Sequence, residues 1–166
     1  MKSKNLIIVG LLILAGGIFS CNEKLEVPDA CEEFPVEIKL IEYSLEGTSC
    51  QWIRFQNSLV RIVNSNEELG NYIECRRNLW GDCVLPCADY PEIDFSKYTL
   101  LIANGFGTSN IGALEFSAQY IECHEIVLSI TVRMGVATVA QPWVLAVLAP
   151  KISAISVVTL KVEYIR

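Results

Sequence analysis

Hydrophobic and polar positions alternate along most of the chain from Val36 onward, and this alternation predicts strands rather than helices. Residues 36–40 alternate cleanly, but from Ile41 the apolar phase is flipped. Because neighbouring side chains of a strand point to opposite faces, the flip requires a bulge or a strand that changes the face it buries. A turn is predicted at 47–49, and apolar residues follow at 52–55 and 59–63 with an interruption at Asn57-Ser58. This predicts a hairpin with an irregular second arm.

The second half of the chain consists of further predicted strands. The apolar run at 98–103 predicts a central strand that is buried on both faces. Residues 114–120 and 128–134 each alternate apolar with polar positions, which predicts an antiparallel hairpin with one polar face. Apolar stretches at 143–148 and 157–164 bring the total to about seven strands.

One short segment has the period of a helix. Ser65 and Glu68 form a capping box, in which the Ser65 hydroxyl accepts a hydrogen bond from the Glu68 amide. Apolar residues follow at Leu69 and then three and four positions further on, so a helix is predicted from this cap to near Cys75. The whole pattern predicts an α+β fold, predominantly antiparallel β and sandwich-like or barrel-like, with one helix packed against the sheet.

Residues 1–20 have the layout of an export signal. Two lysines precede an apolar run from Leu6 to Phe19, and Ser20 then precedes Cys21. A small residue followed by cysteine resembles a bacterial lipobox, although Phe19 is bulkier than the usual residue there. By that resemblance Cys21 becomes the lipidated mature N-terminus. The alternative is a retained transmembrane helix, but the apolar run is shorter than the roughly 20 residues that span a bilayer.

The rest of the chain is predicted to be a spacer followed by one domain. Residues 21–35 are polar and acidic with two prolines, as is typical of a linker between a lipid and a folded body. Residues 36–166 have the length of a single mostly-β domain. The lipid on Cys21 would hold the protein at the cell outer membrane, facing either the periplasm or the cell surface.

Charge narrows the range of partners. The chain carries 13 Lys and Arg against 19 Asp and Glu, a net charge of −6 that becomes −8 when Lys2 and Lys4 leave with the signal. Nucleic-acid binding needs clustered basic residues, and the one adjacent basic pair in the sequence is Arg76-Arg77. We therefore expect a membrane contact through the lipid and an envelope protein as partner, and no nucleic acid.

Six cysteines besides Cys21 predict disulfides, because an even number in an exported chain is typical of bridges formed in an oxidising compartment. The sequence alone does not choose among the possible pairings. Three of the six are crowded between 75 and 87, so at least one local bridge is expected. The candidates are Cys31, Cys50, Cys75, Cys83, Cys87 and Cys123.

These cysteines also allow other chemistries. The three cysteines between 75 and 87, with the single histidine His124, have the side chains of a zinc site. However, Cys83 and Cys87 lack the two-residue spacing of a zinc knuckle, and the compartment is oxidising. Cys123 beside His124 has the residues of a thiol–imidazole pair, but sequence neighbours in a strand point to opposite faces. We assign no catalytic, cofactor-binding or metal-binding residue and do not expect an enzyme.

Residues 76–91 predict an irregular loop, long enough to be either functional or stapled by its cysteines. Trp80 lies among polar residues in this loop and is expected to be exposed. Trp80, with Arg76 and Arg77, is therefore the candidate contact for a partner, because aromatic and arginine side chains dominate binding hot spots. Trp143 lies in an alternating strand and is expected in the core.

Several motifs in the last two thirds of the chain resemble a known family. The motif Pro-Glu-Ile-Asp-Phe-Ser-Lys-Tyr at 91–98 opens the apolar strand, a glycine-containing turn follows, and Pro-Trp at 142–143 and Pro-Lys at 150–151 flank a later strand. Residues 60–166 are similar to the C-terminal domain of the PrcB family, named for a subunit of a bacterial surface protease complex. They also resemble small Bacteroidetes lipoproteins that carry such a domain. The resemblance implies an accessory or stabilising role toward a partner and supplies no catalytic residue.

The function expected from these signals is that of a lipid-anchored cell-envelope protein that holds or stabilises a protein partner such as a protease. Two alternatives stay open. One is a carbohydrate-binding envelope module that uses Trp80. The other is an envelope enzyme, either a hydrolase or a thiol oxidoreductase that uses Cys83 and Cys87.

Overall fold

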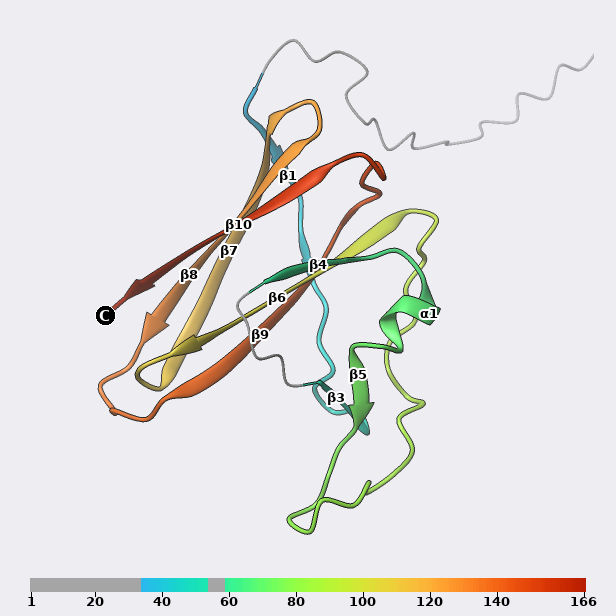
Figure 1. Cartoon of the computed structure of the whole chain (residues 1–166), viewed down its shortest axis with the longest axis vertical. Coiled ribbons are helices and arrows are strands. Elements are labelled where there is room, and N and C mark those ends of the chain that lie inside the picture. The colour runs from blue at the N-terminus through green and yellow to red at the C-terminus, as the bar shows by residue number, and fades with distance from the viewer. Residues whose placement is uncertain (1–33, 54–58) are drawn as a thin grey trace, which may run out of the picture.

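The computed structural model describes residues 34–53 and 59–166 (Figure 1). The predicted signal at 1–20, Cys21 and Cys31 lie outside the described residues, as does nearly all of the spacer. In the part of the chain that is described, no helix has the length and hydropathy needed to cross a bilayer.

Ten strands and one short helix make up the described chain. Eight of the strands form two four-stranded sheets, and the other two pair with each other. In chain order the elements are β1 (Val36–Ile38), β2 (Ile41–Glu42), β3 (Cys50–Trp52), β4 (Val60–Val63), α1 (Asn66–Leu69), β5 (Ile73–Cys75), β6 (Tyr98–Gly107), β7 (Ile111–Glu122), β8 (Glu125–Met134), β9 (Gln141–Pro150) and β10 (Val157–Ile165).

The two four-stranded sheets pack on each other as a sandwich (Figure 1). The first sheet has the order β1-β7-β8-β10 and the second the order β2-β9-β6-β4, and neither closes on itself. Among the described strands, every pair is antiparallel except β10 beside β8. The predicted class is therefore confirmed as mostly antiparallel β with a little helix. The sheets are open rather than barrel-like, and there are more strands than the sequence predicted.

The core between the sheets follows from the alternation in the sequence. Apolar side chains of β7 and β8 turn inward, while Glu115 and Arg133 pair on the outer face with Nε and Oε1 2.6 Å apart. This confirms the predicted hairpin with one polar face. The buried members of this core are Ile38, Leu101, Ala103, Ala118, Ile126, Leu128, Ile130, Val132, Trp143, Leu145, Val147, Ala149 and Ile152.

β6 is buried on both faces, as its continuous apolar run predicts. Alternate residues of 100–103 belong to the core between the sheets and to a second core on the opposite face. Gly105 of β6 lies opposite Trp143 of β9, and a Cβ at Gly105 would overlap the indole ring. Trp143 is 5% exposed, which confirms its predicted place in the core.

The second core lies on the outer face of the β2-β9-β6-β4 sheet. It is covered by α1, by the β3–β5 pair and by the segment that leads into β6. The sandwich thus gains a third, irregular layer on one side. The buried members of this second core are Tyr43, Leu45, Cys50, Val63, Leu69, Ile73, Ile93, Leu100, Ile102 and Ala146.

The flip of apolar phase at Ile41 marks a crossing between the two sheets. β1 pairs with β7 in the first sheet, and β2 pairs with β9 in the second. As a result, Ile38 enters the core between the sheets and Tyr43 enters the second core. The predicted change of buried face is therefore made by a change of sheet.

Two local predictions are wrong. The capping box at Ser65 is present, but α1 ends at Leu69 and residues 73–75 form strand β5 instead of a last helical turn. Gly70 supports a helix poorly, and pairing with β3 overrides the helical period beyond it. The hairpin predicted around the turn at 47–49 is also absent, because β2 before the turn pairs with β9, while β3 and β4 after it pair with β5 and β6.

Candidate functional site

Two disulfides fix both ends of the loop that follows β5. Cys50 and Cys75 are direct neighbours across the β3–β5 pair. Each is bonded to the loop: Cys75 to Cys83, eight residues on, and Cys50 to Cys87, 37 residues on. The predicted local bridge is confirmed, and the predicted irregular loop at 76–91 is fixed by two disulfides. We call it the stapled loop. The loop projects from the sandwich at the lower end of Figure 1.

The turn at the end of this loop is held by its own hydrogen bonds. Asn78 N donates to the Asp82 carbonyl at 2.9 Å and Gly81 N donates to the Asn78 carbonyl at 3.0 Å. The Asn78 side-chain oxygen also accepts from the amides of Trp80 (2.8 Å) and Asp82 (3.0 Å). Gly81 has a φ of +87°, a conformation that glycine adopts without strain. The backbone of the turn is therefore preorganised.

The stapled turn presents large apolar side chains to solvent. Leu79 is fully exposed, Trp80 is 87% exposed, and Val84 and Leu85 are each 61% exposed. We call these four residues the stapled tip. Such a group on a folded surface is unusual for a protein without a partner there. The predicted exposure of Trp80 agrees with this geometry.

The two arginines of the candidate contact bind the chain itself. Arg76 donates from Nε to the Cys50 carbonyl (3.0 Å) and from Nη2 to the Leu45 carbonyl (3.1 Å). Arg77 pairs with Glu74, with Nη2 and Oε2 3.0 Å apart, and donates to the carbonyl of Gly81. Both side chains therefore hold the loop on its base, and the apolar residues are the ones left to meet a partner.

A pocket of about 280 Å³ lies at the base of the stapled tip. Asp89 forms its polar wall and accepts from the Ser49 amide at 2.8 Å and from the Ser49 hydroxyl at 2.5 Å. These bonds hold the pKa of the Asp89 carboxyl below its usual range, and the bond from the Ser49 hydroxyl has the larger effect. The lining residues are Gly47, Thr48, Ser49, Arg76, Val84, Leu85 and Asp89.

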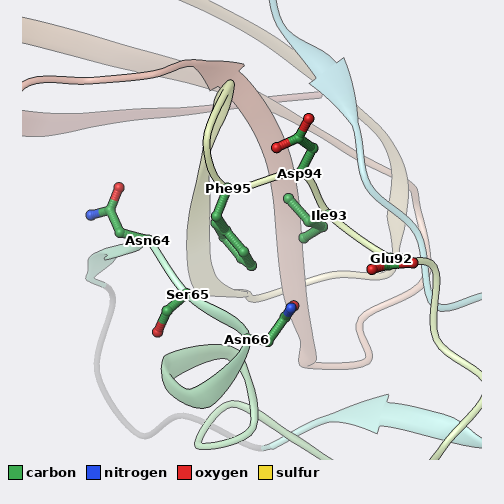
Figure 2. Close-up of a pocket in the computed structure, with 7 residues that line it drawn as sticks. All are labelled: Asn64, Ser65, Asn66, Glu92, Ile93, Asp94 and Phe95. Carbon is green, nitrogen blue, oxygen red and sulfur yellow. The ribbon is translucent and has the colours of Figure 1, made fainter.

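A larger pocket, of about 640 Å³, lies between the start of α1 and the segment before β6 (Figure 2). Figure 2 shows the Phe95 ring and the Asn66 amide turned toward each other, with the Asp94 carboxylate pointing away from them. The lining residues are Asn64, Ser65, Asn66, Glu92, Ile93, Asp94 and Phe95.

Hydrogen bonds at this pocket join the ends of β4, β6 and β9. The Asn64 oxygen accepts from the Thr99 hydroxyl (2.8 Å) and from Lys151 Nζ (3.0 Å). The Ser96 hydroxyl and then Lys97 hold the pKa of the Asp94 carboxyl below its usual range. The polar side chains of this pocket therefore bind one another and hold the strand ends together. The motifs at 91–98 and 150–151 meet here, because the Lys151 amide donates to the Lys97 carbonyl at 2.8 Å.

The cysteines and the histidine do not combine into a reactive site in the described residues. Cys83 and Cys87 belong to different disulfides, so neither supplies a zinc thiolate or forms a redox pair with the other. Cys123 is also disulfide-bonded, and His124 lies exposed in the turn between β7 and β8. Within residues 34–53 and 59–166, no group of three metal-ligating side chains is gathered.

Comparison with known proteins finds no matching family model, no matching curated protein and no matching solved structure.

Proposed function

We propose that this chain is a lipid-anchored accessory protein of the cell envelope that holds or stabilises a protein partner, such as a protease, through the stapled tip. In this proposal residues 1–20 are the export signal and Cys21 carries the lipid at the outer membrane. Residues 60–166 form a domain like that of the PrcB family.

The disulfides support an envelope location. Two bridges lie among the described residues, and Cys123 is bonded as well. Such bonds persist in oxidising compartments and are rare where glutathione keeps thiols reduced. This agrees with the export signal proposed from the first 20 residues.

The observation that carries the partner-binding proposal is the 87% exposure of Trp80 on a turn fixed by a disulfide. Tryptophan is enriched among the few interface residues that supply most of the binding free energy. Ordering a flexible side chain at an interface costs about 0.5–1.5 kcal/mol. A turn whose backbone is already fixed avoids much of the ordering cost, so the stapled tip suits insertion into a concave apolar surface of a partner.

The arrangement of the family-like motifs supports the proposed relationship to the PrcB family. Tyr98, at the end of the 91–98 motif, pairs with Pro150 of the second motif across the β6–β9 ladder. Two short motifs, whose paired residues are 52 positions apart in sequence, are thus neighbours at one corner of the fold. This is the placement expected when both motifs define the same domain.

The first experiment replaces Trp80 with a photo-reactive benzophenone amino acid in the full lipidated chain, followed by irradiation of intact cells and identification of adducts. We expect one recurring envelope protein. In a pull-down of the unmodified chain, Trp80→Ala should lower retention of that protein about tenfold or more, because a tryptophan hot spot contributes about 2 kcal/mol or more.

The matched control is Ile155→Ala. Ile155 is also an exposed apolar residue, 66% exposed, but it lies in the β9–β10 connection at the other end of the sandwich. Retention should be unchanged in this variant. Equal retention by Trp80→Ala and the wild type would contradict the proposal. An adduct with glycan instead of protein would favour the carbohydrate-binding alternative, because the indole ring also stacks on sugars.

A further inference from the structure

The last strand, β10, leaves one edge of the first sheet open (Figure 1, red). It lies at the end of the order β1-β7-β8-β10 and, among the described strands, pairs with β8 alone. β4, the edge strand of the second sheet, lies close to β10 but does not pair with it. β10 follows β8 without a register shift and contains no proline, so neither a bulge nor a missing amide interrupts the edge.

The backbone of β10 directs every second residue toward this open edge. The Val157 amide donates to the His124 carbonyl at 2.7 Å, on the side of β8. In a parallel pair, residues whose amide and carbonyl face the neighbouring strand alternate with residues whose groups face away from it. The even-numbered positions from 158 to 164 therefore direct their amides and carbonyls outward, where no described strand pairs with them.

The side chains at these even-numbered positions form an incompletely covered apolar strip. Val158, Leu160 and Val162 pack against the core between the sheets but are only half-buried. Tyr164 is 39% exposed, and Ile62 of the nearby strand β4 is 37% exposed. The core between the sheets is thus partly open to solvent along this side of the sandwich.

The outer face of β10 carries a lysine and a glutamate two residues apart. Lys161 and Glu163 are both exposed, and their cross-strand partners in β8 are the uncharged Ser129 and Thr131. Neither charge takes part in an ion pair within residues 34–53 and 59–166. A lone lysine is a common protection of an edge strand against pairing. A lysine and a glutamate at this spacing instead form a pattern that an antiparallel copy of the same strand complements.

We propose that β10 pairs with β10 of a second copy of this chain, antiparallel about a two-fold axis at Val162. In that register Lys161 lies opposite Glu163 of the second copy, and the symmetry repeats the pair on the other side of the axis. An axis at Lys161 or at Glu163 would place like charges opposite each other. An axis at Leu160 would leave both charges opposite uncharged residues, so the charges select the register at Val162.

The same register covers the apolar strip. Val162 meets Val162 of the second copy, and Leu160 lies opposite Tyr164 of the second copy, an aliphatic–aromatic pair of the kind that stabilises sheets. The exposed Arg166 falls opposite Val158 of the second copy, at the end of the pairing. The two four-stranded sheets become one continuous sheet across the dimer. The dimer uses no residue of the stapled tip, so this inference and the function proposed above stand or fall separately.

The first test traps the dimer in intact cells that express the full chain. Val162→Cys places two cysteines across the axis, and the Cα atoms of such a hydrogen-bonded pair are about 5.5 Å apart, within reach of a disulfide. We expect a dimer band on a non-reducing gel that reduction removes. The matched control is Thr159→Cys, on the same strand but three residues from the axis. Its two copies would lie about 20 Å apart, so this variant should give no such band.

The charges provide a second test, which needs no added cysteine. In sedimentation of the full chain in detergent, Lys161→Glu and Glu163→Lys should each weaken the dimer at least about fivefold, because each turns two attractive pairs into repulsive ones. The double variant Lys161→Glu/Glu163→Lys should restore the dimer, since its pairs are reversed but intact.

Four results would overturn the inference. They are a monomeric wild type, an equal dimer fraction in all the charge variants, a Val162→Cys band that contains a different protein, and a Thr159→Cys band as strong as that of Val162→Cys. If Val162→Cys alters the circular dichroism spectrum, the charge variants decide the question, because Lys161 and Glu163 are exposed and their exchange leaves the core unchanged.

Discussion

Tyr43 shows how a single side chain joins the layers of this fold. Its ring belongs to the second core, and its hydroxyl donates to the Pro91 carbonyl at 2.8 Å. The bond connects the start of the domain to the segment that follows the stapled loop. Burial raises the pKa of Tyr43 to about 12, and the neighbouring Tyr90 adds to the effect.

This shift makes a prediction about stability at high pH. The folded-state pKa of about 12 lies above the ordinary value of about 10. The contribution of Tyr43 is therefore fully present below about pH 10 and is lost as the pH rises toward 12. Tyr43→Phe should cost about 1 kcal/mol near neutral pH, the value of a typical hydrogen bond, and the gap to the wild type should narrow above pH 10.

The measurement is chemical unfolding of both proteins at a series of pH values, with a parallel absorbance titration of the tyrosines. One late-titrating tyrosine in the wild type should be missing from Tyr43→Phe. A gap in unfolding free energy that stays constant between neutral pH and pH 12 would show that burial does not shift this group.

At the scale of elements, we expect the longer disulfide to contribute more to the free energy of unfolding and the shorter one to fix the shape of the stapled loop. The Cys50–Cys87 bridge closes a span of 37 residues and the Cys75–Cys83 bridge a span of 8. Since the entropy removed from the unfolded chain grows with the span, the double variant Cys50→Ala/Cys87→Ala should lose about 4 kcal/mol of unfolding free energy and Cys75→Ala/Cys83→Ala about 2.5 kcal/mol.

The shorter bridge should matter more for the stapled tip. In Cys75→Ala/Cys83→Ala we expect faster proteolysis within residues 76–85 and weaker partner retention, although Trp80 is unchanged. Limited proteolysis followed by mass spectrometry locates the cuts, and the Cys50→Ala/Cys87→Ala variant controls for general destabilisation. Protection of 76–85 equal to that of the wild type would mean that the hydrogen bonds of Asn78 alone fix the turn.

The elements also show which features the sequence reveals. Strands with strict alternation or a continuous apolar run were predictable, because their pattern reflects burial in a sheet directly. Residues 73–75 were not, because apolar positions three and four residues beyond Leu69 fit a helix equally well and only the distant partner β3 decides the outcome. The parallel pairing of β10 with β8 likewise leaves no local signal.

The candidate site was predictable in part for the same reason. The exposure of Trp80 follows from its polar neighbours in the sequence, and the disulfide framework follows from cysteine number and compartment. The hydrogen bonds by which Arg76 holds the loop on its base could not be predicted, because the acceptors are backbone carbonyls 26 and 31 residues away along the chain.

At the scale of the whole molecule, the remaining cysteines determine how the folded domain would be attached to its proposed lipid anchor. The chain has seven cysteines, four of which form the two bridges at the stapled loop. Cys123 is also disulfide-bonded. If lipidation occupies the sulfur of Cys21, the cysteine left to pair with Cys123 is Cys31. We therefore predict a Cys31–Cys123 disulfide, to be found by peptide mapping under non-reducing conditions.

This bridge would set the reach of the tether. Cys31 lies ten positions after Cys21 along the chain. A fully extended chain spans at most about 3.6 Å per residue, or about 36 Å over this distance. Cys123 lies at the β7–β8 turn, so the bridge would attach the tether to the end of the sandwich at which that turn lies. In Figure 1 the loop that carries the stapled tip projects at the opposite end, so the stapled tip would extend away from the lipid. A free thiol at Cys31 or a peptide linking Cys123 to Cys21 would contradict this arrangement, and the second result would also exclude a lipid on the Cys21 sulfur.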